Sequence, residues 1–117
     1  MSNLVIGSRG LCNADIILVQ HCSLSFDVIH KDSDGNIIDH SNSKFAFAFQ
    51  GAKTHDMSQY VNGDSTGIHV NIPARASEKL PISNMYYDLI VETDVYTQCL
   101  LYGNVQIGDS VSLDERR

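Results

Sequence analysis

The clearest pattern in the chain is the run from Lys44 to Gln50, which reads Lys-Phe-Ala-Phe-Ala-Phe-Gln. Because successive side chains of a β-strand point to opposite faces, a strand places the three phenylalanines on one face and the two alanines on the other. Aromatic rings bury a large apolar area, so Phe45, Phe47 and Phe49 predict a core strand and not a platform for a ligand. The small alanines indicate that the back face is covered as well, either by a neighbouring chain or by the domain's own termini.

Five other segments carry strand signals, either alternation or β-branched runs between turn residues. They are residues 14–20, 22–31, 66–72, 86–93 and 97–107. A short edge strand is expected at 37–39, a turn-rich stretch at 51–65 and a single helical turn at 74–80. Gly103, inside the last strand, predicts a bulge or a close approach of another backbone. These elements predict an all-β domain, an antiparallel β-sandwich of jelly-roll or immunoglobulin-like type with about six to eight strands.

The length of the chain, 117 residues, is close to the commonest size of a single domain. The strand pattern occupies residues 14–108, which we therefore assign to one β-sandwich domain. The pattern is lost at both ends of the sequence. We expect residues 1–13 to form an N-terminal arm and residues 109–117 to form a C-terminal tail.

The charge of the chain bears on its partners. Its formal net charge is −6, with 14 acidic residues against 8 lysines and arginines. The basic residues are scattered, whereas binding to a phosphate backbone needs them clustered, so nucleic acid is not an expected partner. No apolar run approaches the ~20 residues of a membrane helix, so no membrane contact is expected. The first ten residues lack the basic start and the long apolar stretch of a secretion signal, which predicts synthesis and retention in a cytosol.

The three cysteines, Cys12, Cys22 and Cys99, leave two interpretations open. Cys22 and Cys99 would pair across the sandwich, as in immunoglobulin domains, or all three would stay reduced and mostly buried. Reduced thiols are favoured because the cytosol keeps thiols reduced. The chain also has no tryptophan to pack against such a bridge.

Metal binding is not expected from the five histidines or from the acidic turns. No histidine stands at a metal-motif spacing from another ligand, apart from the adjacent His21 and Cys22, which point to opposite faces of a strand. The segment 32–35, Asp-Ser-Asp-Gly, is similar to the opening of a calcium loop. An EF-hand needs its glycine sixth and a glutamate twelfth, whereas here Gly35 is fourth and Ser43 is twelfth. The segment therefore predicts a hairpin turn, and no metal or cofactor is predicted.

Catalytic motifs are not found in the sequence. It has no nucleophile elbow, no phosphate-binding glycine loop and no Cys-x-x-Cys pair. Asp88 and Glu92 share the outer face of one predicted strand, and we interpret them as solvated acids. We predict a protein that is not an enzyme, with no catalytic, cofactor-binding or metal-binding residues.

The C-terminal part of the chain carries a family resemblance. Tyr87–Val91 followed by Leu100–Ile107 resembles a recurrent ending of small β-sandwich domains in tailed-phage virion proteins. Phe26–Val28, the turn at Asp32–Asn36 and Phe47–Phe49 are similar to the first hairpin and third strand of the same domains, among them the N-terminal domain of upper baseplate proteins. The likeness covers about the whole predicted sandwich, and it implies a virion structural subunit made in the host cytoplasm.

This resemblance predicts a non-enzymatic bacteriophage protein, either a capsid-decorating (cement) protein or a tail or baseplate subunit. Such a protein would bind neighbouring virion proteins through its arms and sheet edges. We also expect a homo-oligomer or lattice copies, because exposed β-edges need covering and virion proteins repeat. The alternative is a ligand- or carbohydrate-binding β-sandwich module, for which the candidate contact residues are Tyr60, Tyr86, Tyr96 and Tyr102.

Overall fold

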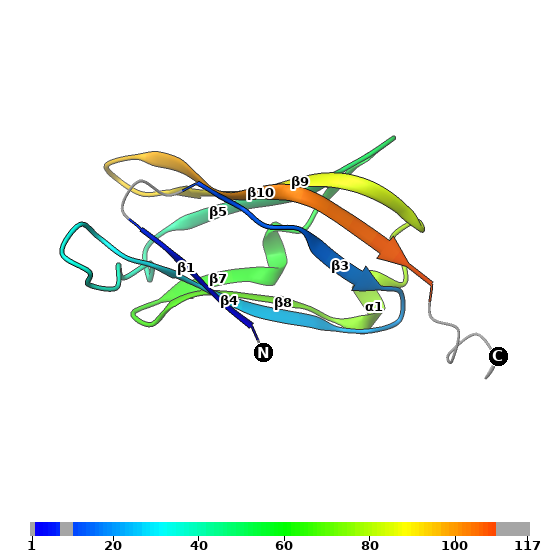
Figure 1. Ribbon diagram of the computed structural model, residues 1–117, viewed down its shortest axis with the longest axis horizontal. Coiled ribbons are helices and arrows are strands. Elements are labelled where there is room, and N and C mark those ends of the chain that lie inside the picture. The colour runs from blue at the N-terminus through cyan, green and yellow to red at the C-terminus, as the bar shows by residue number, and fades with distance from the viewer. Residues whose placement is uncertain (1, 8–10, 110–117) are drawn as a thin grey trace.

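The computed structural model describes residues 2–7 and 11–109 and folds them into two β-sheets that pack face to face (Figure 1). The first sheet has the order β1–β4–β8–β7, and its strands are β1 (Ser2–Ile6), β4 (Leu24–His30), β8 (Gly67–Ile72) and β7 (Val61–Asp64). The second has the order β2–β10–β9–β5–β6, with β3 also paired to β10, and its strands are β2 (Cys12–Asn13), β3 (Ile16–Val19), β10 (Thr97–Gly108), β9 (Ser83–Glu92), β5 (Lys44–Gln50) and β6 (Thr54–Asp56). The prediction of an all-β sandwich is confirmed.

The direction of strand pairing differs between the middle of each sheet and its N-terminal edge. The pairs β4–β8, β5–β9 and β9–β10 are antiparallel, as predicted. By contrast, β1 pairs in parallel with β4, and β2 and β3 pair in parallel with β10. Alternation in a sequence reports which face of a strand is buried and not the direction of its partner, so the mixed character of both sheets was not predicted.

The N-terminal segment lies within the sandwich and does not extend from it. Residues 1–13 were expected to form an arm, but β1 lies beside β4 in one layer and β2 beside β10 in the other (Figure 1). Both strands bond to backbone groups that β4 and β10 would otherwise leave unpaired at a sheet edge. The C-terminal tail predicted at 109–117 lies outside the described residues, apart from Asp109.

The core lies between the two sheets, with the aromatic row of β5 near its centre. Phe47 and Phe49 are fully buried, and the Phe47 ring meets those of Phe49 and Tyr87 edge to face at centroid distances of 5.3 and 5.9 Å. Phe45, at the start of the row, is only partly buried and packs edge-on against the ring of His40. The core assignment of this strand is therefore confirmed.

Several local predictions differ from the structure. Residues 37–39 form no strand: Ile37 makes one bridge to Lys31, and the backbone N–H of His40 bonds instead to the carbonyl oxygen of Asp64, at the end of β7. The stretch 51–65 contains β6, β7 and the short 3₁₀ helix η1 (Ser58–Tyr60), not turns alone. Ala46 is exposed, so the described residues do not cover the back of β5 at that position.

Other local predictions are confirmed. A single helical turn, α1 (Ala74–Ser77), joins β8 to β9 at one end of the sandwich (Figure 1). At residues 32–36 the chain makes a tight turn. The Oδ1 atom of Asp32 accepts hydrogen bonds from the backbone N–H groups of Asp34 and Asn36, both at 2.9 Å. Gly35 takes a positive φ of 83°, which a glycine adopts without strain.

Gly103 lies where the neighbour of β10 changes from β2 to β3. A Cβ atom built on Gly103 would stand 2.5 Å from the carbonyl oxygen of Ala14 and 3.1 Å from Oδ1 of Asp15. That carboxylate oxygen also accepts a hydrogen bond from the backbone N–H of Asn104 at 3.1 Å. The predicted close backbone approach is thus confirmed, and the bulge of this strand lies elsewhere, between Cys99 and Leu101.

Replacing Gly103 with alanine is expected to lower the free energy of unfolding by about 1–3 kcal/mol, because the added methyl group forces a backbone apart. Gly108→Ala, on the same strand, is the matched control, since a Cβ atom there meets nothing within 4 Å. Urea unfolding of both variants measures the difference. Equal stability of the two variants would contradict the close approach at Gly103.

Candidate functional site

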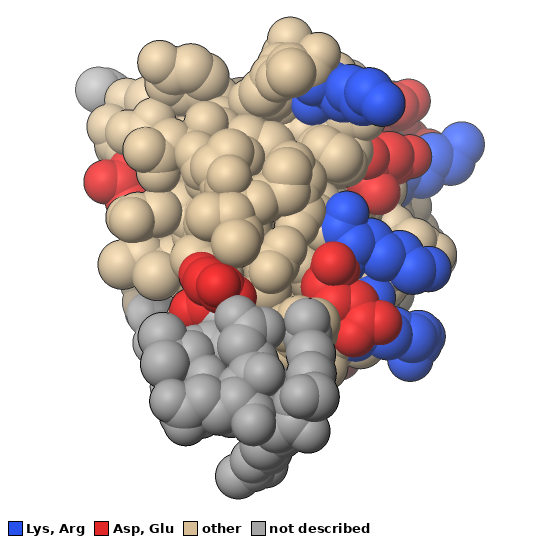
Figure 2. Space-filling view, turned by 90° about the vertical axis from the view of Figure 1, so that its right-hand side faces the viewer, with Lys and Arg blue, Asp and Glu red and all other residues tan. Residues whose placement is uncertain are grey.

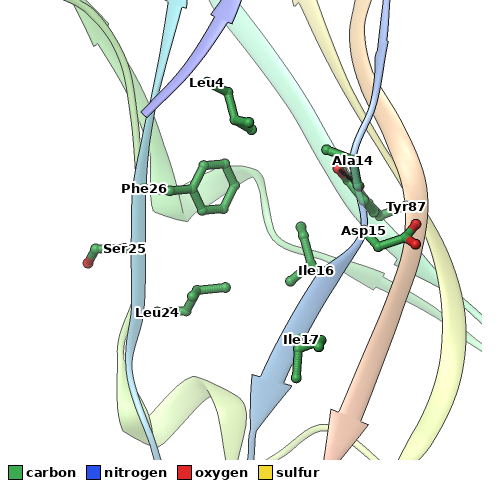
Figure 3. Close-up of a pocket in the computed structure, with 9 residues that line it drawn as sticks. All are labelled: Leu4, Ala14, Asp15, Ile16, Ile17, Leu24, Ser25, Phe26 and Tyr87. Atoms are coloured by element: carbon green, nitrogen blue, oxygen red, sulfur yellow. Dashed lines mark hydrogen bonds between the residues drawn. The ribbon is translucent and has the colours of Figure 1, made fainter. Parts of the chain in front are cut away.

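An apolar groove opens between the sheets, where β1 and β4 face β3 (Figure 3). Its volume is about 280 Å³. Leu4, Leu24 and Phe26 line it from one sheet and Ile16 from the other, while Ser25 points away from the cavity. The groove therefore lies between the N-terminal edges of the two sheets.

Tyr87 lines the same groove and is bonded to its wall. Its hydroxyl donates a hydrogen bond to the carbonyl oxygen of Ala14, in the link between β2 and β3. Burial raises the pKa of the Tyr87 hydroxyl above its usual value, with smaller contributions from Cys12 and other nearby groups. The hydroxyl is therefore a neutral hydrogen-bond donor that tethers the link.

A histidine on the outer face of the first sheet lies between two carboxylates. Asp27 of β4 and His69 of β8 are direct cross-strand partners, and His69 Nδ1 lies 2.7 Å from Asp27 Oδ1. On its other side, Nε2 lies 3.1 Å from both carboxylate oxygens of Asp64 and from the hydroxyl oxygen of Thr66. No spacing in the sequence predicted this cluster, because it depends on the register between β4 and β8.

The order Asp27–His69–Thr66 is superficially that of an acid–base–nucleophile triad, but the proton positions do not fit one. The Thr66 hydroxyl donates to Asp64 Oδ1, so its proton is not directed at the imidazole. Hydrogen bonds to Asp27 and then to Asp64 raise the pKa of His69. Hydrogen bonds from Thr66 and His69 lower the pKa of Asp64 to about 2. The cluster therefore stabilises an imidazolium between two carboxylates and does not activate a hydroxyl.

Replacing His69 with glutamine is expected to remove a pH dependence of stability above pH 6.5. The raised pKa of His69 adds stability that is fully present below the unfolded value of 6.5 and is lost as the pH rises through the folded value. Wild-type protein should thus lose stability relative to His69→Gln as the pH rises above 6.5 in urea unfolding. Parallel curves for the two proteins over this range would contradict the assignment.

Two histidines pair inside the sandwich, next to the loop that joins β4 to β5. His30 and His40 are 1% and 0% exposed, and His30 Nδ1 lies 3.1 Å from His40 Nε2. His40 Nδ1 lies 2.8 Å from the hydroxyl oxygen of Ser43, while Nε2 of His30 is buried with no partner among the described residues. Burial, with a contribution from His40, lowers the pKa of His30, and burial lowers the pKa of His40 against the opposing effect of Asp39. Both rings are therefore neutral at pH 7.

The structure separates the four candidate tyrosines. Tyr86 and Tyr102 line one hollow on the outer face of the second sheet and are 73% and 40% exposed. Tyr60 packs partly buried against the core, and Tyr96 lies in the turn between β9 and β10. The structure thus brings together two of the four, and it leaves the other two outside that hollow.

The cysteines and the charged residues form no further site. Cys12, Cys22 and Cys99 are free thiols of intermediate exposure, so the described chain contains no Cys22–Cys99 bridge. Within residues 2–7 and 11–109, no group of three or more histidine, cysteine or acidic side chains is placed to hold a metal ion. No helix in this part of the chain is long and apolar enough to cross a membrane. At the end of the sandwich that carries α1, lysines and arginines alternate with acids along one side, and the centre is uncharged (Figure 2).

Comparison with known proteins adds a likeness of fold. No family model matches the chain, and no curated protein sequence matches it. The fold is similar to the solved N-terminal domain of ORF48 of phage TP901-1, with a TM-score of 0.50 and 8% sequence identity. The match covers 92% of this chain and 99% of that one. At this identity the likeness shows a shared β-sandwich fold that extends over nearly the whole of both chains.

Proposed function

We propose that the chain is a non-enzymatic structural subunit of a bacteriophage particle. The observation that carries this proposal is the fold match to a phage protein domain over 92% of this chain. The resemblance of its last hairpin to virion β-sandwich domains points to the same class of protein. The cluster around His69 does not argue for an enzyme, because the Thr66 hydroxyl donates its hydrogen bond to Asp64 and not to the imidazole.

Within the particle, we propose a tail or baseplate position in preference to the outside of the capsid. The sequence resemblance includes the N-terminal domain of upper baseplate proteins, and the matched structure is itself an N-terminal domain of a phage protein. A capsid-decorating protein was expected to reach neighbouring virion proteins through its terminal arms as well as its sheet edges. Residues 2–6 and 12–13 instead pair within the sheets, which removes that part of the argument.

The contact with neighbouring virion proteins is proposed to involve the N-terminal edge of the sandwich. Ile17 of β3 lines the apolar groove of Figure 3 and is 69% exposed, and Val5 of β1, next in sequence to the groove residue Leu4, is 59% exposed. Edge strands offer unpaired backbone groups to an added strand, and exposed apolar side chains around a groove favour burial by a partner. One surface thereby supplies both backbone pairing and apolar contact.

Cryo-electron microscopy of the particles of the phage that encodes the chain, together with mass spectrometry of their separated heads and tails, tests the proposal. We expect the chain in the tail fraction in multiple copies per particle, with density for β1 and β3 against a neighbouring protein. Absence from purified particles would refute the structural role. Presence in heads alone would leave that role standing and refute the tail position.

A further inference from the structure

The outer face of the second sheet combines exposed tyrosines with side-chain amides. We call this surface the tyrosine face and define it by Asn13, Asn84, Tyr86, Tyr102, Asn104 and Gln106, all of them exposed. These residues come from β2, β9 and β10, three neighbouring strands of one sheet. They contribute four amides and two phenol rings but no lysine or arginine.

The register of the strands sets these side chains in rows across the sheet. Tyr86 lies opposite Asn104, and two residues along β9, Asn84 lies opposite Gln106. On β2, Asn13 lies beside Tyr102. Directly opposite side chains on one face are close enough to contact the same small molecule. Each aromatic ring is thus adjacent to an amide that can donate and accept hydrogen bonds.

Two hollows lie along this face and meet at one residue. The first, of about 290 Å³, is lined by Tyr86, Tyr102, Gly103 and Asn13, among others. The second, of about 420 Å³, is lined by Asn84, Gln106 and Ile17, among others. Asn104 lines both. Volumes of this order are at the small end of ligand sites, so adjoining hollows fit successive units of an oligomer.

The chemistry of the face favours a neutral, hydroxyl-rich ligand. A tyrosine ring offers an apolar face to the C–H groups of a sugar, and amides bond to its hydroxyls in either direction. Two charged side chains lie next to the hollows: Asp15 lines the second hollow, and Asp88 lies opposite Tyr102. The other acids of the described residues, which contribute to the chain's net charge of −6, do not line either hollow. Tyrosine rings supply apolar area to the lining of the first hollow, and amide groups border both hollows, a combination that suits a ligand with both C–H faces and hydroxyls. We propose that the tyrosine face binds a neutral oligosaccharide across both hollows.

This proposal does not depend on the phage assignment, because it rests on the surface alone. Saturation-transfer NMR with the full chain tests it, using trisaccharides of glucose, galactose and N-acetylglucosamine as probes, and calorimetry then measures affinity. We expect at least one trisaccharide to receive saturation. Tyr86→Ala and Tyr102→Ala should each weaken its binding about 10-fold, the equivalent of one stacked ring. Tyr86→Phe, which keeps the ring, should lose about twofold or less.

Tyr96→Ala is the matched control, because Tyr96 is an exposed tyrosine that lies outside both hollows. It should bind the same trisaccharide as the wild type does, and all the variants should keep the wild-type melting temperature. Failure of every trisaccharide to bind would overturn the proposal, as would binding that survives the loss of both Tyr86 and Tyr102. Self-association that depends on Tyr86 and Tyr102, without saccharide binding, would assign the face to protein contact instead.

Discussion

Replacing Phe47 with alanine is expected to lower the free energy of unfolding by about 3–5 kcal/mol, the largest effect of any substitution proposed for this protein. Phe47 is 1% exposed, and its ring lies edge to face against Phe49 and Tyr87. Truncation removes these contacts and leaves a cavity. Strand pairing holds both sheets in position, so they cannot close over it. Urea unfolding, with an unchanged m-value as the sign of a two-state transition, measures the loss.

Phe45→Ala is the matched control for this substitution. Phe45 belongs to the same aromatic row but is only partly buried, so the same change should cost distinctly less. A loss at Phe47 no greater than the loss at Phe45 would contradict the placement of the core centre. Such a result would also contradict the prediction of a core strand from the alternating phenylalanines of residues 44–50.

Acidification from pH 6.5 to 5 is expected to destabilise the protein steeply through the buried pair His30–His40. The folded pKa of each ring is lowered, first by burial, so each adds stability that is present above the unfolded value of 6.5. That stability is lost as the pH falls toward the folded values, because the unfolded chain then binds protons that the folded chain excludes. Each ring that is protonated only in the unfolded chain adds to this loss, so the two rings together give a steeper profile than either ring alone.

Urea unfolding between about pH 5 and 6.5 isolates this effect. The lowered carboxyl pKa values of Asp39, Asp56 and Asp64 add stability that is present above the unfolded value of 3.8 and is lost only in more acidic solution. The double variant His30→Leu/His40→Leu should lose the slope. His69→Gln should keep it, because the raised pKa of His69 acts above pH 6.5. A flat wild-type profile over this range would contradict neutral burial of the pair, even if the double variant fails to fold.

The parts of the fold that follow from local pattern were predictable. The bounds of β5, Lys44–Gln50, agree with the alternation of phenylalanine and alanine, and the outline of β10 with its close approach at Gly103 was also foreseen. These features depend on which side of a strand is buried and on the absence of a side chain. Both properties can be read from neighbouring residues alone.

The features that were missed depend on residues far apart in the sequence. His40 lies in a polar segment, and its burial follows from its partner His30 and from contact with Phe45. Asp27 and His69 meet only because β4 and β8 pair in one particular register, and a shift of one residue would turn them to opposite faces. The hollow between Tyr86 and Tyr102 likewise requires the register of β9 with β10.

The pairing of the first strands with β10 also determines when the sandwich can close. The hydrogen bond from the Asn104 N–H to Asp15 spans 89 residues, and β3 lies on β10 up to Gly108. An emerging chain therefore makes β1, β2 and β3 long before the strand that receives β2 and β3 exists. Contacts of such long range carry a high entropic cost of loop closure, and proteins dominated by them fold in about milliseconds to seconds. Until β10 is synthesised, Ile16 and Leu18 have no sheet to join, and the apolar N-terminal edge is most open to other chains at that stage.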